Sequence, residues 1–276
     1  MNSDIEKRTE ALIRQAGELM LGFRQLQVTS KGRHGDYVTQ ADRAVQDMLL
    51  SGLSSLYPEA AFIAEEKDNG ALPDQPAFII DPIDGTTNFF RHRESSVISV
   101  GLTVNQRAAE GWIYNPYRGE MFHAVKGKGA WRNGERISVS PVPAKNALVY
   151  LGTSSYYEEL MELTGLSALR LLPRIADFRR TGSCALELCD IAQGKAEALF
   201  EWRLQPWDIC AGTLLVEEAG GRCGHILEGD VTFTGPVPFL AANSESFDEI
   251  RAMLRSVFEE WSAGQTVSSV NRAVKP

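Results

Sequence analysis

The sequence FIIDPIDGTTNF (Phe78–Phe89) joins an apolar run, two carboxylates and a turn within twelve residues. An apolar run that stops at Asp81 is typical of a buried strand that delivers a carboxylate to the edge of a sheet. Pro82 fixes φ and has no N–H to donate, so we expect the strand to end there and the chain to turn. Asp84 lies on that turn, and the residues from Gly85 onward favour the start of a short helix. Two acids and a free helix N-terminus therefore face one point.

Carboxylates this close together require a cation or a proton. At about 4 Å, two of them repel each other by roughly 4 kcal/mol at an effective dielectric constant of about 20. Oxygen ligands favour Mg²⁺ or a similar ion, and the N–H groups at a helix start favour the phosphate that such ions accompany. Residues 78–89 therefore predict a metal-assisted phosphate site. The alternative is an ordinary exit from a strand, in which Asp81 and Asp84 only make Asx turns.

Composition restricts the class of protein. The chain has 276 residues, 43% hydrophobic and 23% charged, which is ordinary for a globular enzyme with a large core in one domain or two joined halves. A net charge of −8 argues against binding nucleic acid by bulk attraction, and it would also repel a free phosphate ester. Phosphate chemistry must then depend on local positive charge, which bound metal ions supply.

The N-terminus and the cysteines favour a cytoplasmic protein with no membrane partner. The first eight residues include charges and no apolar signal core, and no uncharged apolar run reaches membrane-spanning length. The four cysteines form no C-x-x-C pair, which is typical of reduced core thiols. The four histidines favour surface or core positions over a zinc site.

Hydrophobic periodicity predicts an α+β half over residues 1–143. Helical spacing runs from Ile5 to Leu26 and again after Thr39 to Leu56, and a short strand is expected at 61–64. An antiparallel meander follows over residues 97–131, with Asn133-Gly134 as a hairpin turn. This half contains residues 78–89, and a proline-rich connector at 141–143 ends it.

Residues 144–263 alternate strands with helices, which predicts a layered α/β half. The expected strands are 148–151, 196–200 and 239–242, and the expected helices are 156–163, 184–193, 208–219 and 247–261. Residues 264–276 lack an apolar face, and we expect a flexible tail there.

A second acidic segment, WDICAGTLLVEEAGG (Trp207–Gly221), places Asp208 at a helix start and two glycines at its end. Asp208 alone is explained as an N-cap, and Thr39 with Asp42 as a variant capping box. Small residues on one face allow this helix to lie close to another backbone. Acids at strand ends and helix starts are nevertheless more numerous than capping requires, so we expect these to converge: Asp42, Glu65, Asp81, Asp84 and Asp208.

Four segments together resemble the inositol monophosphatase family of Mg²⁺-dependent, lithium-sensitive phosphatases. They are D-P-I-D-G-T-T-N-F from Asp81, W-D-x-x-A-G and its continuation to Gly221, D-x-V-T-x-x-D from Asp36, and the pair Glu65-Glu66. The resemblance covers nearly the whole chain up to the tail. It implies a sandwich of alternating α-β-α-β-α layers, as in inositol monophosphatase and fructose bisphosphatase. It also implies a homodimer, two or three Mg²⁺ ions as cofactor, and a small phosphate monoester as substrate.

The resemblance also implies roles for individual residues. The metal ligands would be Glu65, Asp81, Asp84, Asp208 and the carbonyl of Ile83. The catalytic residues would be Glu65 and Thr86, which order the attacking water, and Asp42, which lies beside Thr86. The substrate contacts would be Lys31, Gly85 and Thr86 near the phosphate, Cys184 and Glu201 near the sugar ring, and Asp84 and Asp208.

Other phosphatase chemistries fit the sequence less well. The haloacid-dehalogenase type places an aspartyl nucleophile two residues before D-G-T, where this chain has Pro82. No cysteine is followed six residues later by arginine, and no G-x-S-x-G turn is present. A metal-activated water is then the expected nucleophile.

The expected reaction is hydrolysis of a sugar or polyol phosphate, with myo-inositol 1-phosphate as the first substrate to test. Thr87 stands where relatives that act on 3′-phosphonucleotides usually have lysine. Fructose 1,6-bisphosphate and histidinol phosphate remain open as substrates. Residues 91–95 depart from the aromatic and proline residues that often follow the motif. The second hypothesis is a non-catalytic regulatory or binding protein, but such a protein would have lost some of the acids.

Overall fold

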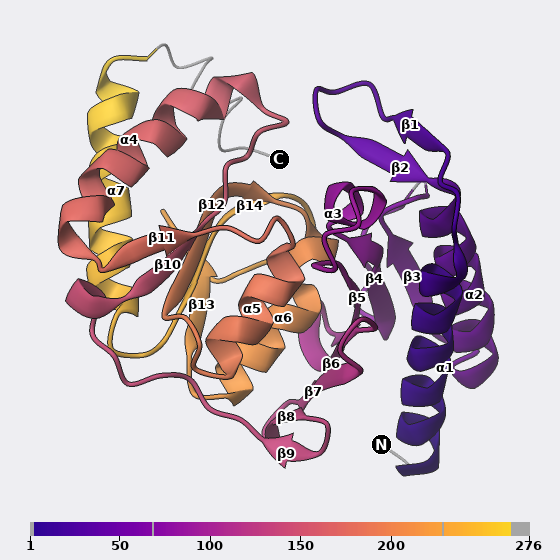
Figure 1. Ribbon diagram of the computed structural model, residues 1–276. Helices are drawn as coiled ribbons and strands as arrows, with labels where there is room; N and C mark the ends of the chain where they lie inside the picture. Colours follow the sequence, from indigo (N-terminus) through magenta and orange to yellow (C-terminus); the bar gives the residue numbers. More distant parts are fainter. Residues whose placement is uncertain (1–2, 68, 228, 266–276) are drawn as a thin grey trace.

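The computed structural model describes residues 3–67, 69–227 and 229–265. Its longer helices are α1 (Ser3–Gly22), α2 (Gln40–Leu56), α4 (Met161–Leu171), α5 (Cys184–Ala192), α6 (Pro206–Glu218) and α7 (Phe247–Ala263). Helices α1 and α2 cover one face of a seven-stranded sheet, and α5 and α6 lie between that sheet and a five-stranded sheet (Figure 1). Helices α4 and α7 cover the far face of the second sheet. The predicted sandwich of alternating α-β-α-β-α layers is therefore confirmed.

The seven-stranded sheet contains the predicted meander. Its strands, in spatial order, are β3 (Ala61–Ala64), β4 (Ala77–Asp84), β5 (Val97–Val104), β6 (Arg107–Asn115), β7 (Glu120–Val125), β8 (Gly129–Arg132) and β9 (Glu135–Arg136). Strands β3 and β4 are parallel, and every later pair is antiparallel. The Asn133-Gly134 hairpin is confirmed, because both residues have positive φ, 50° and 81°, between the paired Arg132 and Glu135.

The five-stranded sheet mixes parallel and antiparallel pairs. Its strands, in spatial order, are β11 (Asp177–Arg179), β10 (Leu148–Leu151), β12 (Ala198–Leu204), β14 (Val237–Ala242) and β13 (Arg222–His225). A separate hairpin of β1 (Val28–Ser30) and β2 (Tyr37–Thr39) flanks residues 31–36, which contain Gly32 and Gly35. The short helix α3 (Thr86–Phe90) and 3-10 turns at Ala144–Asn146, Glu158–Leu160 and Leu172–Arg174 complete the described elements.

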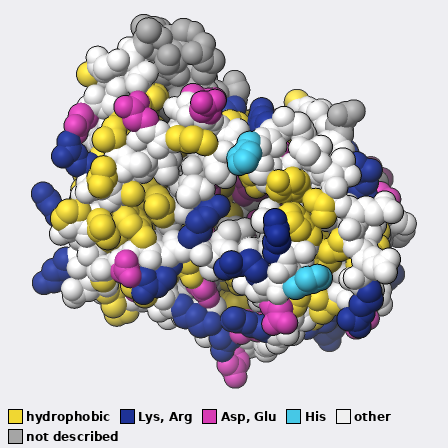
Figure 2. Space-filling view, turned by 45° about the horizontal axis from the view of Figure 1, so that its top comes forward, with side chains coloured by type: hydrophobic (Ala, Val, Ile, Leu, Met, Phe, Trp, Pro, Cys, Tyr) yellow, Lys and Arg dark blue, Asp and Glu magenta, His cyan; other side chains and the backbone are white. Residues whose placement is uncertain are grey.

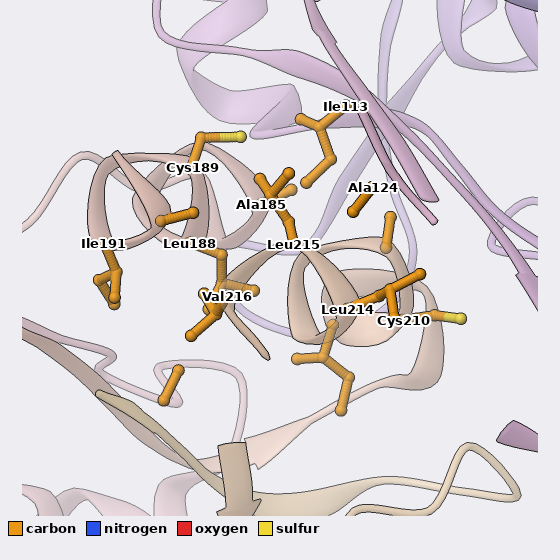
Figure 3. Close-up of a cluster of buried hydrophobic side chains, with 14 of the residues drawn as sticks. Ile113, Ala124, Ala185, Leu188, Cys189, Ile191, Cys210, Leu214, Leu215 and Val216 are labelled. Carbon is orange, nitrogen blue, oxygen red and sulfur yellow. The ribbon is translucent and has the colours of Figure 1, made fainter. Parts of the chain in front are cut away.

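Strand side chains alternate between separate hydrophobic clusters, because helices cover both faces of each sheet. On β4, Phe78 packs with the α1 and α2 side, whereas Ile79 packs toward α5 and α6. On β12, Leu199 joins the same central cluster, and Phe200 packs toward α4 and α7. Figure 3 shows the central cluster, where the side chains of α5 and α6 meet Ile113 of the seven-stranded sheet. The alternation explains why these strands are apolar runs.

Helix α6 lies very close to the seven-stranded sheet, as its small residues predicted. A Cβ atom added to Gly111 of β6 would come within 3.0 Å of the Cα and carbonyl oxygen of Ala211. A Cβ atom added to Gly101 of β5 would come within 3.1 Å of the Ala211 nitrogen. Glycine in both strands is therefore what allows the helix backbone, and Asp208 with it, to approach the sheet.

Strand β4 does not end at Pro82, and that prediction was wrong. The strand continues to Asp84, and its pairing with β5 shifts between Asp81 and Asp84, where Pro82 needs no ladder hydrogen bond. In a regular strand, residues three apart point to opposite faces. The extra residue compensates for this, and both carboxylates line one pocket.

The helix predicted at 156–163 was wrongly placed. A 3-10 turn at Glu158–Leu160 leads into α4, because residues 154–157 form a pocket wall with backbone that is not helical. Helix α1 ends at Gly22 rather than near Leu26. Gln205 is the N-cap of α6, and Asp208 is its third residue, so Asp208 is not the cap. The prediction missed strands β1, β2, β11 and β13, because these short strands carry no continuous apolar run, unlike the four-residue strands at 61–64 and 148–151.

The structure does not test two of the predictions, the flexible tail and the division of the chain into two halves. Most of the expected tail, residues 266–276, lies outside the described residues, and Gly264 caps α7. The division of the chain at 143 and 144 stays a prediction. Within the described part of the chain, no helix combines the length and the apolar character needed to cross a bilayer.

Candidate metal and phosphate site

A pocket of about 340 Å³ lies where the end of β4 meets the starts of α3, α5 and α6. All of the predicted site residues except Asp42 line it: Lys31, Glu65, Asp81, Ile83, Asp84, Gly85, Thr86, Cys184, Glu201 and Asp208. Figure 2 shows a hollow in this face of the molecule, with acidic side chains in its depth and Lys and Arg side chains around it. The structure therefore brings together residues that are up to 177 positions apart, from Lys31 to Asp208.

Burial raises the pKa of the carboxyl groups in this pocket, and neighbouring acids add to the rise for Asp81 and Asp208. Burial, followed by the charges of Glu65, Asp84 and Asp208, raises the pKa of Asp81 well above its ordinary value. Burial, with Asp84 and Glu65, does the same for the pKa of Asp208. The pKa of Asp84 rises to about 6 because burial outweighs the hydrogen bonds from Ser183 and from backbone N–H groups. Mutual repulsion of this kind means that the acids share one small volume.

Asp84 is held by the start of α5. The hydroxyl of Ser183 donates to Asp84 Oδ2 at 2.6 Å, and the backbone N–H of Ala185 donates to the same oxygen at 2.7 Å. Asp81 Oδ1 accepts from the N–H of Ile83 at 3.0 Å, which is the Asx-type turn of the alternative interpretation. Asp208 Oδ2 accepts from the N–H of Gln205 at 2.7 Å. The same three aspartates therefore accept local backbone hydrogen bonds and also line the pocket.

Lys31 approaches the pocket from the β1–β2 hairpin. Its ammonium donates to Glu65 Oε1 at 2.7 Å and also forms an ion pair with Glu66. Burial lowers the pKa of Lys31, but Glu65 and Glu66 outweigh burial, and the net pKa lies above its ordinary value. Lys31 therefore stays protonated and supplies positive charge beside Glu65.

Thr86 and Asp42 form the predicted pair behind the pocket. The Thr86 hydroxyl donates to Asp42 Oδ1 at 2.9 Å, and Asp42 Oδ2 accepts from both the N–H and the hydroxyl of Thr39. The capping box at the start of α2 is therefore confirmed, and it also fixes the carboxylate that receives Thr86. Burial raises the pKa of Asp42, and the hydrogen bonds from Thr39 and Thr86 oppose that rise.

Gly85 makes the turn between β4 and α3 possible. Its φ is 89°, in the left-handed region that favours glycine. A Cβ atom there would lie 3.2 Å from each of the Gly182 carbonyl oxygen, the Ser183 side chain and the Ser95 carbonyl oxygen. The first N–H groups of a helix have no partner inside it, so this turn presents donors to the pocket.

The carboxylate and carbonyl oxygens of the pocket suit a divalent cation, although their present arrangement does not form a complete coordination site. Carboxylate and carbonyl oxygens are the ligands that Mg²⁺ prefers. Among the residues that the structure describes, no three Asp, Glu, His or Cys side chains converge closely enough to coordinate one ion as they stand. Lys31 and Ser183 engage two of the carboxylates, Glu65 and Asp84. A bound cation would compete with Lys31 and Ser183 for these carboxylates.

Glu201 and Cys184 line the pocket on the side of the second sheet. Glu201 Oε1 accepts from the N–H of Ser154 at 2.6 Å, and burial raises its pKa against the opposing charge of Arg180. Burial, with Asp84 and Asp208, raises the pKa of Cys184 well above its ordinary value. Cys184 is therefore a thiol near neutral pH, which argues against a thiolate nucleophile here.

Sequence reasoning missed Glu187, which is 3% exposed and braces the loop before α5. Its Oε1 accepts from the N–H and hydroxyl of Thr181, at 2.6 and 2.9 Å, and from the N–H of Gly182 at 3.2 Å. Asn88 of α3 donates to the Thr181 carbonyl at 3.0 Å from the other side. A carboxylate inside the apolar run of residues 184–192 was the available signal.

The chain is similar to known proteins over most of its length. A sequence model of the inositol monophosphatase family matches residues 1–257. Human inositol monophosphatase 1 is 37% identical over 220 residues, which cover 76% of this chain and 79% of the human protein. Nus factor SuhB of Escherichia coli K12 is 32% identical over 240 residues, which cover 86% of this chain and 88% of SuhB.

Solved structures of related proteins are also similar to this chain over most of its length. The extragenic suppressor protein suhB of Bartonella henselae has a TM-score of 0.83 at 30% identity and covers 93% of this chain and 99% of its own. An inositol monophosphatase of Thermotoga maritima has a TM-score of 0.80 at 31% identity, covering 91% and 96% of the two chains. With the acids of residues 65, 81, 84 and 208 gathered in one pocket, this chain belongs to the inositol monophosphatase family.

Proposed function

We propose that the protein is a Mg²⁺-dependent phosphomonoesterase that hydrolyses a sugar or polyol phosphate, with myo-inositol 1-phosphate as the leading substrate. One observation carries the proposal. Glu65, Asp81, Asp84 and Asp208 come from separate parts of the chain and line one pocket, where burial and the charges of neighbouring acids raise the pKa of Asp81 and of Asp208. Such repulsion is tolerable in an active protein when divalent cations occupy the site.

Glu65, Asp81, Asp84, Asp208 and the carbonyl of Ile83 would hold two or three ions. When bound, Mg²⁺ neutralises phosphate charge and lowers the pKa of a coordinated water. The residues of this chain do the positioning. The Thr86 hydroxyl donates a hydrogen bond to Asp42, so the Thr86 oxygen is available to accept a hydrogen bond from the attacking water and orient it. The N–H groups of Gly85 and Thr86 would donate to the phosphate oxygens.

The remaining pocket residues suit the organic part of the substrate. Glu201 lines the pocket and, among the described residues, accepts a backbone hydrogen bond from Ser154 alone. A carboxylate in this position is able to accept hydrogen bonds from sugar or polyol hydroxyls. Arg203 and Gln205 also line the pocket, and such polar groups support a hydroxylated substrate.

A panel of phosphate esters tests this proposal. Phosphate release is measured from myo-inositol 1-phosphate, histidinol phosphate, a 3′-phosphonucleotide and 4-nitrophenyl phosphate, with Mg²⁺ and with EDTA. We expect release with Mg²⁺, the highest kcat/KM for the polyol ester, and no release with EDTA. If the Mg²⁺-loaded protein releases no phosphate from any ester, the proposal fails, and a binding or regulatory protein with this fold becomes the better explanation.

A further inference from the structure

Strand β3 lies at the edge of the seven-stranded sheet, and its partner among the described strands is β4. An edge strand leaves backbone N–H and C=O groups without a partner strand on its open side. Successive residues of a strand point these groups to alternate sides. The N–H of Glu65, just beyond β3, points inward and donates to the Ile80 carbonyl of β4 at 3.2 Å. The backbone groups of Ala64 and Glu66 therefore face the open side.

Two side-chain amides bind these outward-facing groups. The Ala64 N–H donates to Asn69 Oδ1 at 2.9 Å, and Asn69 Nδ2 donates to the Ala64 carbonyl at 2.7 Å. The Glu66 N–H donates to Gln46 Oε1 at 2.9 Å, and Gln46 Nε2 donates to the Glu66 carbonyl at 3.0 Å. An amide side chain has a donor and an acceptor, as a peptide group has. Asn69 and Gln46 therefore take the place of a neighbouring strand at this edge.

Glu65 is the residue between the two held positions, and its carboxylate lines the metal and phosphate pocket. The direction in which a side chain leaves the backbone depends on the local backbone conformation, which is restrained when the residues on both sides are held. Lys31 contacts the Glu65 carboxylate itself, whereas the two amides act on the backbone. A cation that replaces Lys31 therefore leaves both amides in place.

We propose that Gln46 and Asn69 are positioning residues that hold Glu65 in place to bind the metal ion. The inference rests on the proposed function, in which Glu65 is a metal ligand. Gln46 belongs to α2 and is 4% exposed. Helix α2 then supports the site twice, through Asp42 in its first turn and through Gln46 four residues later. Loss of a group that orients a metal ligand typically lowers metal affinity or activity about 10–100-fold.

Two variants remove the amides, Gln46→Met and Asn69→Ala. Gln46→Met keeps the length of the side chain and loses both hydrogen bonds. The matched control is Ser167→Ala, because Ser167 is also a buried helix residue with two hydrogen bonds. It accepts from Trp202 Nε1 at 3.0 Å, donates to the Leu163 carbonyl at 2.7 Å, and lines neither this pocket nor its neighbour.

Three quantities are measured for each protein. They are hydrogen–deuterium exchange of residues 64–66 in EDTA, the Kd of Mg²⁺ by calorimetric titration of the metal-free protein, and kcat with myo-inositol 1-phosphate. We expect exchange to be about tenfold faster in both amide variants, and the Kd of Mg²⁺ to rise about tenfold. At saturating Mg²⁺, kcat should stay within about threefold of wild type, because excess ion selects the productive orientation of Glu65. In Ser167→Ala all three should stay at the wild-type values.

If exchange accelerates in Gln46→Met while the Kd of Mg²⁺ stays unchanged, the amides support the sheet edge alone, and the inference fails while the proposed function stands. An equal loss of Mg²⁺ affinity in Ser167→Ala would also overturn it. If the wild type binds Mg²⁺ but hydrolyses no ester, the proposed function fails, and the Mg²⁺ titrations of the variants still decide the inference. A wild type that binds no Mg²⁺ overturns both.

Discussion

Asp84 is the residue at which the two halves of the site meet. It comes from residues 78–89, yet its Oδ2 is held by Ser183 and Ala185, about a hundred positions later in the chain. These two contacts hold the carboxylate in place despite its repulsion by Asp81 and Asp208. Glu187 in turn holds the loop that supplies these contacts. The position of Asp84, a proposed metal ligand, therefore depends on a residue outside every motif.

Replacing Glu187 tests this dependence. Glu187→Ala leaves three donors of Thr181 and Gly182 without their acceptor, which should cost about 1–3 kcal/mol of unfolding free energy. The loosened Ser183 contact should also lower kcat about tenfold with little change in KM, because positioning affects the reacting state more than binding. Stability is measured by urea unfolding, and kcat with myo-inositol 1-phosphate and Mg²⁺.

Glu187→Gln is the matched control, because its amide oxygen still accepts these hydrogen bonds. Activity and stability should return close to the wild-type values. If Glu187→Gln loses as much kcat as Glu187→Ala, the charge of Glu187 matters, and its role is not to hold the loop. If neither variant loses kcat, the loop does not position Asp84.

At this scale, the sequence predicts the acids but not their partners. Asp81, Asp84 and Asp208 follow from motifs in which each acid sits at the end of a recognisable element. Ser183 and Glu187 act across the fold, and no local pattern relates residue 187 to residue 84. Glu187 is detectable only as a carboxylate within an apolar helix, which indicates a buried partner without naming it.

Among the elements, the approach of α6 to the sheet is what carries Asp208 to the pocket. Gly101 and Gly111 have no side chain at the points where Ala211 touches β5 and β6. The sequence shows the small residues of α6. It does not show that Gly101 and Gly111 lie opposite them, because sheet register cannot be read from one chain. The register shift in β4 is similar, since pairing with β5 rather than Pro82 alone decides it.

Gly111→Ala should weaken this contact. The added methyl group would meet the Ala211 backbone at 3.0 Å, which cannot move as a flexible side chain does. We expect a loss of about 1–3 kcal/mol in unfolding free energy, as for overpacking of a core. The control is Gly165→Ala in α4, where a Cβ atom meets nothing within 4 Å, so the change should be neutral or stabilising. Equal stabilities for the two variants in urea unfolding would refute the close contact.

On the scale of the whole molecule, the covered strands and amphipathic helices follow from the sequence pattern, and their five-layer order follows from the family resemblance. The electrostatics of the pocket follow only from the fold. Apolar runs at 78–80 and 198–200 indicate strands covered on both faces, and amphipathic helices supply the covers. The number of acids is visible in the sequence as well. Their mutual pKa shifts are not, because these depend on distances between layers.

The pocket acids make the stability of the metal-free protein depend on pH. The fold raises the pKa of Asp84 to about 6 and that of Glu187 to about 7, whereas unfolded carboxyl groups titrate near about 4. A raised pKa means that the folded state binds more protons, so its stabilising effect is present at low pH and is lost as pH rises through the folded pKa.

Melting temperatures in EDTA should therefore fall between about pH 6 and pH 8, and added Mg²⁺ should raise them more at the higher pH, because the ionised acids bind the ion. Differential scanning fluorimetry with and without Mg²⁺ measures both effects. A metal-free melting temperature that rises over this range, or one that Mg²⁺ leaves unchanged at pH 8, would contradict the assignment of the pocket.

The most direct measurement is phosphate release by Asp84→Asn. The variant keeps an oxygen acceptor for Ser183 and removes the charge that a metal ion requires. With Mg²⁺ and myo-inositol 1-phosphate, we predict a fall in kcat of about 100-fold or more, as expected for loss of a metal ligand. Asp177→Asn, an exposed aspartate of β11 paired with Arg179, should keep kcat within about twofold, since surface ion pairs contribute little. Near-normal turnover by a folded Asp84→Asn protein would contradict the central claim that these carboxylates hold the catalytic metal ions.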